Sequence, residues 1–188
     1  MNKAILIVDP QVDFINGALP VNNAENKMNE LSQFLSDNDG MFLLKMVTTD
    51  WHPYNHMSFK DNGGMWVKHC VQNSEGAALW FPLIEALNTT KGDNFVLRKG
   101  DDSTKEEYSI FDNELSSKRI LDLLSSYHID ELTICGLAGD ICVTETIKSA
   151  IDKVGKGKIK VLTKFSPSLD GGKTLKELVK DNGLNSDL

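Results

Sequence analysis

The chain has 188 residues, 40% of them hydrophobic and 25% charged, which is the balance of a soluble globular protein with one sizeable core. Its 20 basic and 27 acidic side chains give a net charge of −7, which argues against nucleic acid or an anionic membrane as a partner and favours a small-molecule substrate. The three cysteines lack CxxC spacing, so the sequence indicates neither a disulfide framework nor a cysteine zinc site.

The first predicted element is a strand over residues 4–8, an almost purely apolar run that polar Asp9 ends. The run is too short for a signal sequence or a membrane span, so we expect a cytoplasmic protein. An amphipathic helix capped by Asn22 or Asn23 should follow, with its buried face formed by Met28, Leu31, Phe34 and Leu35.

The middle of the chain holds a second predicted strand over residues 41–48 and a third over residues 94–98. Residues 50–80 between them are rich in loop-forming residues and contain three of the four histidines. So long an irregular segment in a compact protein usually carries function. A helix capped by Ser116 or Ser117 should come after the third strand.

The last third of the chain continues the alternation, with strands over residues 131–135 and 158–162 and a helix between them. A closing helix is expected around Leu175 and Val179, followed by a frayed end. Strands that alternate with helices imply the α/β class. We expect one domain over residues 1–188, built on a parallel sheet of about six strands with helices on both faces.

Four polar features each follow a predicted strand: Asp9, Asp50, Lys99 and the turn from Gly136 to Cys142. In open α/β sheets, chemistry gathers beyond the carboxyl ends of the strands. Residues that are far apart in the sequence are therefore expected to converge on one crevice.

Cys142 is the candidate nucleophile, because it falls in the first turn of a predicted helix, where free backbone N–H groups and the helix dipole stabilise a thiolate. The same N–H groups could serve as an oxyanion hole. The alternative is that the cysteine is simply a small buried hydrophobic residue, which is the interpretation that suits Cys135 within its strand.

Two charged residues could assist this cysteine. Asp9 is expected to be buried at the end of the first strand, which would raise its pKa and let it take and return a proton. Lys99 could lie beside Asp9 and Cys142 and favour their ionised forms. Each has a plainer alternative, a solvated turn carboxylate for Asp9 and a surface lysine for Lys99, and only the expected convergence argues for catalysis.

The most specific local feature is the segment Asp50-Trp51-His52-Pro53-Tyr54-Asn55-His56, with His69 following 13 residues later. In extended backbone Asp50 and His52 project to the same side, and His69 or His56 could complete an N/O set of metal ligands. Three protein ligands would leave positions open for water or substrate, as in a catalytic site. We expect one divalent ion, with zinc as the first choice and iron or manganese as alternatives.

Six motifs follow one another along nearly the whole chain. They are Asp9-Pro10-Gln11-Val12-Asp13-Phe14, Gly17-Ala18-Leu19-Pro20-Val21, Thr49-Asp50-Trp51-His52-Pro53 with His56, Trp66 to Cys70, Arg98-Lys99-Gly100, and Gly136-Leu137-Ala138-Gly139-Asp140-Ile141-Cys142-Val143. In this order they resemble the nicotinamidases (pyrazinamidases) of the isochorismatase-like hydrolase superfamily. One departure is Gly139, which replaces a common threonine and is expected to loosen the turn before Cys142.

The resemblance implies a fold, a reaction and a set of roles. The fold would be that of an isochorismatase-like hydrolase, and the reaction would be hydrolysis of nicotinamide to nicotinate and ammonia through a cysteine thioester, in NAD salvage. The catalytic residues would be Asp9, Lys99 and Cys142. The metal ligands would be Asp50, His52 and His69, with His56 as an occasional further ligand. The substrate would contact Phe14, Trp66 and Ala138, and a cis peptide would join Leu137 to Ala138.

Two alternatives remain open from the sequence. A related cysteine amidohydrolase acting on another small amide or carbamoyl compound would keep Asp9, Lys99 and Cys142 without needing the metal ligands, whose presence favours nicotinamide. An inactive binding protein of the same fold would need neither set. The sequence also leaves open whether the chain forms a homo-oligomer.

Overall fold

Six parallel strands form one sheet in the computed structural model, which describes residues 1–187. Across the sheet the strands lie in the order β3, β2, β1, β4, β5, β6. Their bounds are β1 (Lys3–Val8), β2 (Leu44–Asp50), β3 (Asp93–Lys99), β4 (Glu131–Gly136), β5 (Ile159–Val161) and β6 (Asn185–Ser186). The predicted α/β class and parallel sheet are confirmed.

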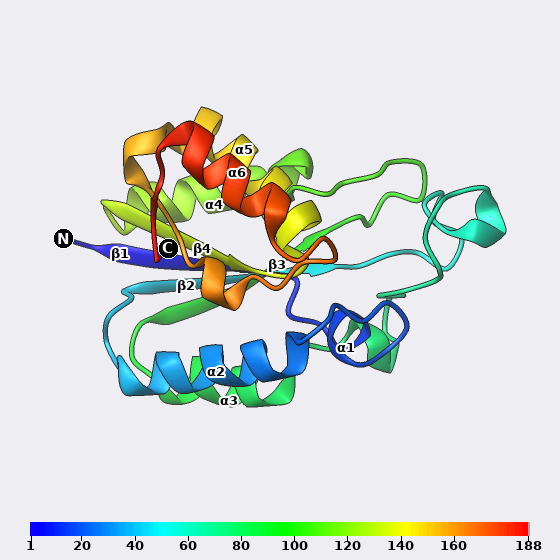
Figure 1. Cartoon of the computed structure of the whole chain (residues 1–188), viewed down its shortest axis with the longest axis horizontal. Helices are drawn as coiled ribbons and strands as arrows, with labels where there is room; N and C mark the ends of the chain where they lie inside the picture. The colour runs from blue at the N-terminus through cyan, green and yellow to red at the C-terminus, as the bar shows by residue number, and fades with distance from the viewer. Residues whose placement is uncertain (188) are drawn as a thin grey trace.

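Helices cover both faces of this sheet, as predicted (Figure 1). One face carries the short α1 (Val12–Ile15), α2 (Ala24–Asp37) and α3 (Phe81–Thr89). The other carries α4 (Glu114–Ser126), α5 (Thr144–Ala150) and α6 (Lys173–Asn182). Among residues 1–187, none of the helices has the length and apolar character to cross a membrane.

The alternation of side chains along β1 explains why the sheet has a core on each face. Ala4, Leu6 and Val8 belong to the hydrophobic cluster that packs under α4, α5 and α6. Ile5 and Ile7 belong to the cluster on the side of α2 and α3. Successive residues of a strand point to opposite faces, so a strand buried on both sides must be apolar throughout.

Two predicted helix starts are wrong in detail. The helix predicted to begin after Ser116 or Ser117 begins at Glu114, because the side chain of Asn113 accepts the N–H of Ser116 and caps it. Asn23 does precede α2, but it adopts a left-handed conformation with φ of 63° and its side chain makes no capping hydrogen bond. Of the predicted apolar face, Met28, Leu31 and Leu35 are buried and Phe34 is half-buried.

Other elements differ from the sequence prediction or were missed. Strand β2 begins at Leu44 rather than at residue 41, and it continues to Asp50. Helix α3 was not predicted. The end of the chain is not simply frayed, because Asn185–Ser186 pairs with β5 and supplies the sixth strand.

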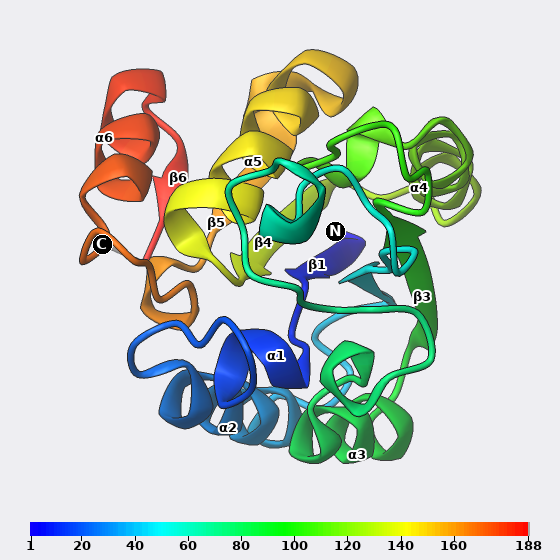
Figure 2. The same ribbon diagram turned by 90° about the vertical axis from the view of Figure 1, so that its right-hand side faces the viewer.

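The segment between β2 and α3 is irregular, as predicted, and crosses the carboxyl ends of the strands (Figure 2). Its regular structure consists of two short 3-10 turns, Lys60–Asn62 and Glu75–Ala77, among residues 51–80. An isolated bridge pairs His52 with Val71 and brings the two ends of the segment together. The histidines of this segment are thereby held over the edge of the sheet where the strands end.

Candidate active site

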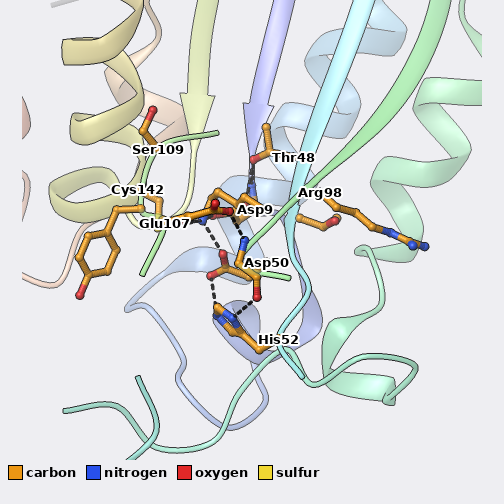
Figure 3. Close-up of polar contacts among 12 residues, drawn as sticks. Asp9, Thr48, Asp50, His52, Arg98, Glu107, Ser109 and Cys142 are labelled. Atoms are coloured by element: carbon orange, nitrogen blue, oxygen red, sulfur yellow. Dashed lines mark hydrogen bonds and ion pairs between the residues drawn. The ribbon is translucent and has the colours of Figure 1, made fainter. Parts of the chain in front are cut away.

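The strand register brings four of the predicted site residues together, and three of them, Asp9, Asp50 and Cys142, are labelled in Figure 3. Asp50 and Lys99 are paired residues at the ends of the neighbouring strands β2 and β3. Asp9 follows the end of β1, the next strand across the sheet, and its backbone N–H donates to the carbonyl of Thr48 at 3.1 Å. The fourth residue, Cys142, comes from the turn that follows β4.

Lys99 is the centre of the cluster and is fully buried. Its Nζ lies 3.0 Å from Asp9 Oδ2 and 3.6 Å from Cys142 Sγ, and it donates a close hydrogen bond to Asp50 Oδ1. Burial alone would lower the pKa of Lys99, but the Asp50 and Asp9 carboxylates hold this pKa well above its ordinary value. Lys99 is therefore a permanent cation shared between two carboxylates and a thiol.

Asp9 sits at a turn with φ of 46°, a left-handed conformation that directs the chain away from the sheet after β1. Its Oδ1 accepts a hydrogen bond of 2.6 Å from the hydroxyl of Thr48. Burial raises the pKa of Asp9, with the nearby Asp50 adding to this, while Lys99 and Thr48 oppose it. A carboxyl with a raised pKa beside a thiol has the properties of a general acid and base.

Cys142 lies in a five-residue π-helical stretch, Gly139–Val143, that leads into α5. Its Sγ lies within 4.8 Å of a carboxylate oxygen of Asp9, and burial raises the pKa of the thiol well above its ordinary value although Lys99 opposes this. The sequence predicts a thiolate stabilised at the start of a helix. Burial in the structure instead favours the neutral thiol, so the resting sulfur needs a base.

Gly139 packs tightly against the turn's neighbours, contrary to the expectation that it loosens this turn. A Cβ at this position would lie 2.3 Å from both the carbonyl oxygen of Ser166 and the hydroxyl of Ser168. The Gly139 N–H donates to the carbonyl of Pro167 at 2.8 Å. The glycine is required by close approach, and the peptide between Leu137 and Ala138 just before it is cis, as the resemblance implied.

Asp50, His52 and His69 form a group that could hold a metal ion, with one ligand atom from each lying within 4.8 Å of the others. All three side chains are buried. The pKa of Asp50 is lowered, because Lys99 and the two histidines outweigh the effect of burial. The group thus offers a permanent carboxylate and two imidazoles, a donor set that suits zinc.

Hydrogen bonds to backbone carbonyls determine which ring nitrogen of His52 and of His69 is free to bind a metal ion. His52 Nδ1 lies 2.9 Å from the carbonyl oxygen of Gly100, and His69 Nδ1 lies 2.8 Å from that of Val67. A carbonyl oxygen only accepts, so both Nδ1 atoms carry the proton in the neutral rings. Each Nε2 is left with its lone pair, and these atoms lie 3.6 Å and 4.0 Å from Asp50 Oδ2. The residues therefore fit a divalent cation.

His56 lies beside this group, with its ring 4.1 Å from that of His52, but both of its nitrogens have other partners. Nδ1 is 2.7 Å from the hydroxyl of Ser58, and Nε2 is 2.8 Å from the carbonyl of Lys105. The geometry brings Asp50, His52 and His69 together as a candidate set of ligands and leaves His56 as their packing neighbour.

A pocket opens beside Cys142 and the candidate metal ligands Asp50 and His69. The three residues expected to contact a substrate, Phe14, Trp66 and Ala138, all line it, together with Asp50, His69 and Cys142. Leu19, Val21 and Ile141, which lie within the motifs, also line the pocket, and so do Glu106, Tyr108 and Leu169, which were not predicted. Aromatic and aliphatic walls with a few polar groups at one end suit a small flat ring that carries a polar substituent.

Three supporting residues were also missed. The Gln11 side chain donates to the Asp50 carbonyl and accepts the Asp50 N–H, both at 2.8 Å, and so ties the turn after β1 to the end of β2. Thr48 holds Asp9, and Glu107 accepts the N–H of Gly100 at 2.7 Å. Gln11 had a signal, its place in the first motif, whereas Thr48 and Glu107 have none in the sequence alone.

Comparisons with known proteins identify the family of the chain. A model of the isochorismatase domain matches residues 3–155. The nicotinamidase of Escherichia coli (strain K12) is 35% identical over 167 residues, covering 79% of this chain and 76% of that protein. The pyrazinamidase of Pyrococcus horikoshii, solved in complex with zinc, has a TM-score of 0.82 at 28% identity and covers 99% of this chain and 98% of its own. PnC1 from L. infantum, solved with nicotinate, has a TM-score of 0.85 at 29% identity, covering 98% and 91%. Since the domain model matches most of its length, this chain belongs to the isochorismatase family.

Proposed function

We propose that this chain is an amidohydrolase that converts nicotinamide to nicotinate and ammonia, with Asp9, Lys99 and Cys142 as its catalytic residues. The observation that carries the proposal is the position of Lys99 Nζ, 3.0 Å from Asp9 Oδ2 and 3.6 Å from Cys142 Sγ. Cys142 in turn lines a pocket with aromatic walls. The relatives named as nicotinamidases, and a similar fold solved with nicotinate, support the choice of substrate.

Asp50, His52 and His69 would hold one divalent cation, with zinc as the first choice and iron or manganese as alternatives. The similar pyrazinamidase solved with zinc supports this choice. These three residues would hold the ion, which would supply a Lewis acid able to bind a ring nitrogen of the substrate. Phe14 and Trp66 enclose the ring, which places the carboxamide at Cys142.

The first half of the reaction is acyl transfer to sulfur. Asp9, which has a carboxylate oxygen within 4.8 Å of Cys142 Sγ, accepts the proton of the thiol, and Lys99 offsets the negative charge on both groups. The sulfur adds to the carboxamide carbon, and the N–H groups of Ala138 and Cys142 face the resulting oxyanion. The carbon–nitrogen bond then breaks while Asp9 returns the proton, so ammonia leaves and a thioester remains.

The second half is hydrolysis of that thioester. Asp9, again a carboxylate, takes a proton from water as the water oxygen adds to the thioester carbon. The carbon–sulfur bond breaks, the sulfur regains a proton from Asp9, and nicotinate is released. We place this reaction in NAD salvage in the cytoplasm.

Release of ammonia from nicotinamide by zinc-loaded, reduced protein tests the proposal, with other small amides and carbamoyl compounds alongside. Wild-type protein should release one ammonia per nicotinate, and Cys142→Ala should release none. Cys135→Ala is a matched control, because Cys135 is equally buried but lies inside β4. Rapid quenching followed by mass spectrometry should show the acyl group on a peptide that contains Cys142. No turnover of nicotinamide by the metal-loaded wild type would refute the assignment.

A further inference from the structure

Glu107 lies behind the pocket wall, yet it contacts both halves of the active site. The residue is 6% exposed, and its Oε2 accepts the backbone N–H of Gly100 at 2.7 Å and the side-chain amide of Asn113 at 3.0 Å. Its own backbone carbonyl accepts a hydrogen bond of 3.2 Å from Lys99 Nζ. A buried carboxylate held by two amide donors is a fixed support for the groups around it.

The link from Glu107 to the metal ligands passes through Gly100. Glu107 holds the N–H of Gly100, and the carbonyl of Gly100 holds His52 Nδ1, which leaves His52 Nε2 directed at Asp50. The His52 ring also packs directly on this turn, since a Cβ on Gly100 would lie 2.5 Å from its Cε1. Any displacement of Gly100 therefore moves the imidazole that would bind the ion.

The link from Glu107 to the cysteine half passes through Lys99. Lys99 immediately precedes Gly100, and its Nζ contacts Asp9, Cys142 and the Glu107 carbonyl at once. The Glu107 side chain determines where that carbonyl lies, because it ties the segment to Asn113. Asn113 is itself fixed, since its Oδ1 accepts the N–H of Ser116 at the start of α4.

We propose that Glu107 is a positioning residue that aligns His52 for the metal and Lys99 for the cysteine chemistry at the same time. It lies outside the set of residues that line the pocket and acts through Gly100 and its own carbonyl. This inference rests on the proposed function, which assigns the roles of His52 and Lys99.

The test compares three variants in two measurements. Glu107→Ala should weaken zinc binding to metal-free protein, measured by isothermal titration, about tenfold, and should lower kcat for nicotinamide at saturating zinc by a similar factor. Glu107→Gln keeps an acceptor oxygen and should retain most of both quantities. Asp112→Ala is the control, because it removes a carboxylate that accepts the Ser109 N–H nearby and should change neither quantity.

Two results for Glu107→Ala would overturn the inference. One is unchanged zinc affinity and unchanged kcat, and the other is a fall in only one of these two quantities. If the Ala variant fails to fold, Glu107→Asp replaces it. Because its side chain is shorter, Glu107→Asp should have lower zinc affinity and lower kcat than Glu107→Gln. Equal values of zinc affinity and kcat in these two variants would contradict the proposal. A wild-type protein that neither binds zinc nor releases ammonia from nicotinamide would overturn the proposed function as well, which separates the two failures.

Discussion

The ion pair between Asp9 and Lys99 joins two side chains that are both fully buried, with 3.0 Å between Oδ2 and Nζ. Lys99 also bonds Asp50, so a single ammonium group offsets two carboxylates in the interior. Removing one partner of a buried ion pair leaves an uncompensated charge, which destabilises a fold far more than loss of a surface pair does.

Lys99→Met should therefore abolish turnover and also destabilise the protein. We expect the free energy of unfolding in urea to fall by roughly 3–5 kcal/mol, because Asp9 and Asp50 lose their cation. Lys45→Met is the matched control, since Lys45 is a second buried lysine, and its Nζ bonds uncharged carbonyl and hydroxyl oxygens of Leu87 and Thr90. That variant should be less stable than the wild type yet retain kcat. Full activity in Lys99→Met would contradict its assigned role.

The pH dependence of kcat/KM should report Asp9. The reaction needs Asp9 as a carboxylate, so activity falls as the pH drops through its pKa, and burial places that pKa above the ordinary value of 3.8. The Thr48 hydroxyl lowers the pKa of Asp9, so Thr48→Val should move the acid limb to higher pH. Thr49→Val is the control, because its hydroxyl bonds the Leu97 carbonyl instead. An acid limb that moves to lower pH in Thr48→Val would disprove this account.

Metal content should distinguish the histidines. His69→Ala removes an Nε2 that faces Asp50, so zinc bound per chain, measured by elemental analysis after dialysis, should fall well below that of the wild type. His56→Asn should retain zinc, because both ring nitrogens of His56 already have partners in Ser58 and Lys105. Zinc loss in His56→Asn equal to that in His69→Ala would show that His56 is a ligand. Chelation of the wild type should raise KM for nicotinamide, and added zinc should restore it.

The rim of the pocket should affect binding more than chemistry. Trp66 Nε1 donates to the Tyr108 hydroxyl at 3.1 Å, and both residues line the pocket. Tyr108→Phe keeps the aromatic wall but frees the indole, so we expect KM for nicotinamide to rise severalfold with little change in kcat. Tyr54→Phe should leave both constants unchanged, because Tyr54 is 72% exposed. A large fall in kcat with unchanged KM in Tyr108→Phe would point to a role in the chemical step.

The sequence was sufficient for features that follow from local pattern. The apolar run before Asp9 predicts a strand buried on both faces, and the positions of Asp50 and Lys99 after their strands predict that they meet. Helix α3 was missed although Pro82 near its start, with Leu83, Ala86 and Leu87 at helical spacing, is a usable signal.

The supporting contacts could not be predicted, because they join residues that are far apart in the chain. Thr48 and Asp9 are separated by 39 positions, and nothing in either local sequence indicates their hydrogen bond. In the sequence Glu107 is one of several acidic residues in a polar loop. Its hydrogen bond with the N–H of Gly100 becomes evident only in the folded structure. Charged residues that follow strands can be recognised in the sequence. The residues that support them, such as Thr48 and Glu107, cannot, because their contacts depend on how the loops pack.

Gly100 shows how strongly a supporting residue can restrict substitution at the site. Its φ of 69° disfavours any side chain, and its closeness to His52 leaves no room for a methyl group. A comprehensive mutational scan should therefore find position 100 among the least tolerant in the protein, although it has no side chain that could act on a substrate. Selection would preserve the absence of a side chain at this position, because the His52 ring occupies the space that a Cβ would need.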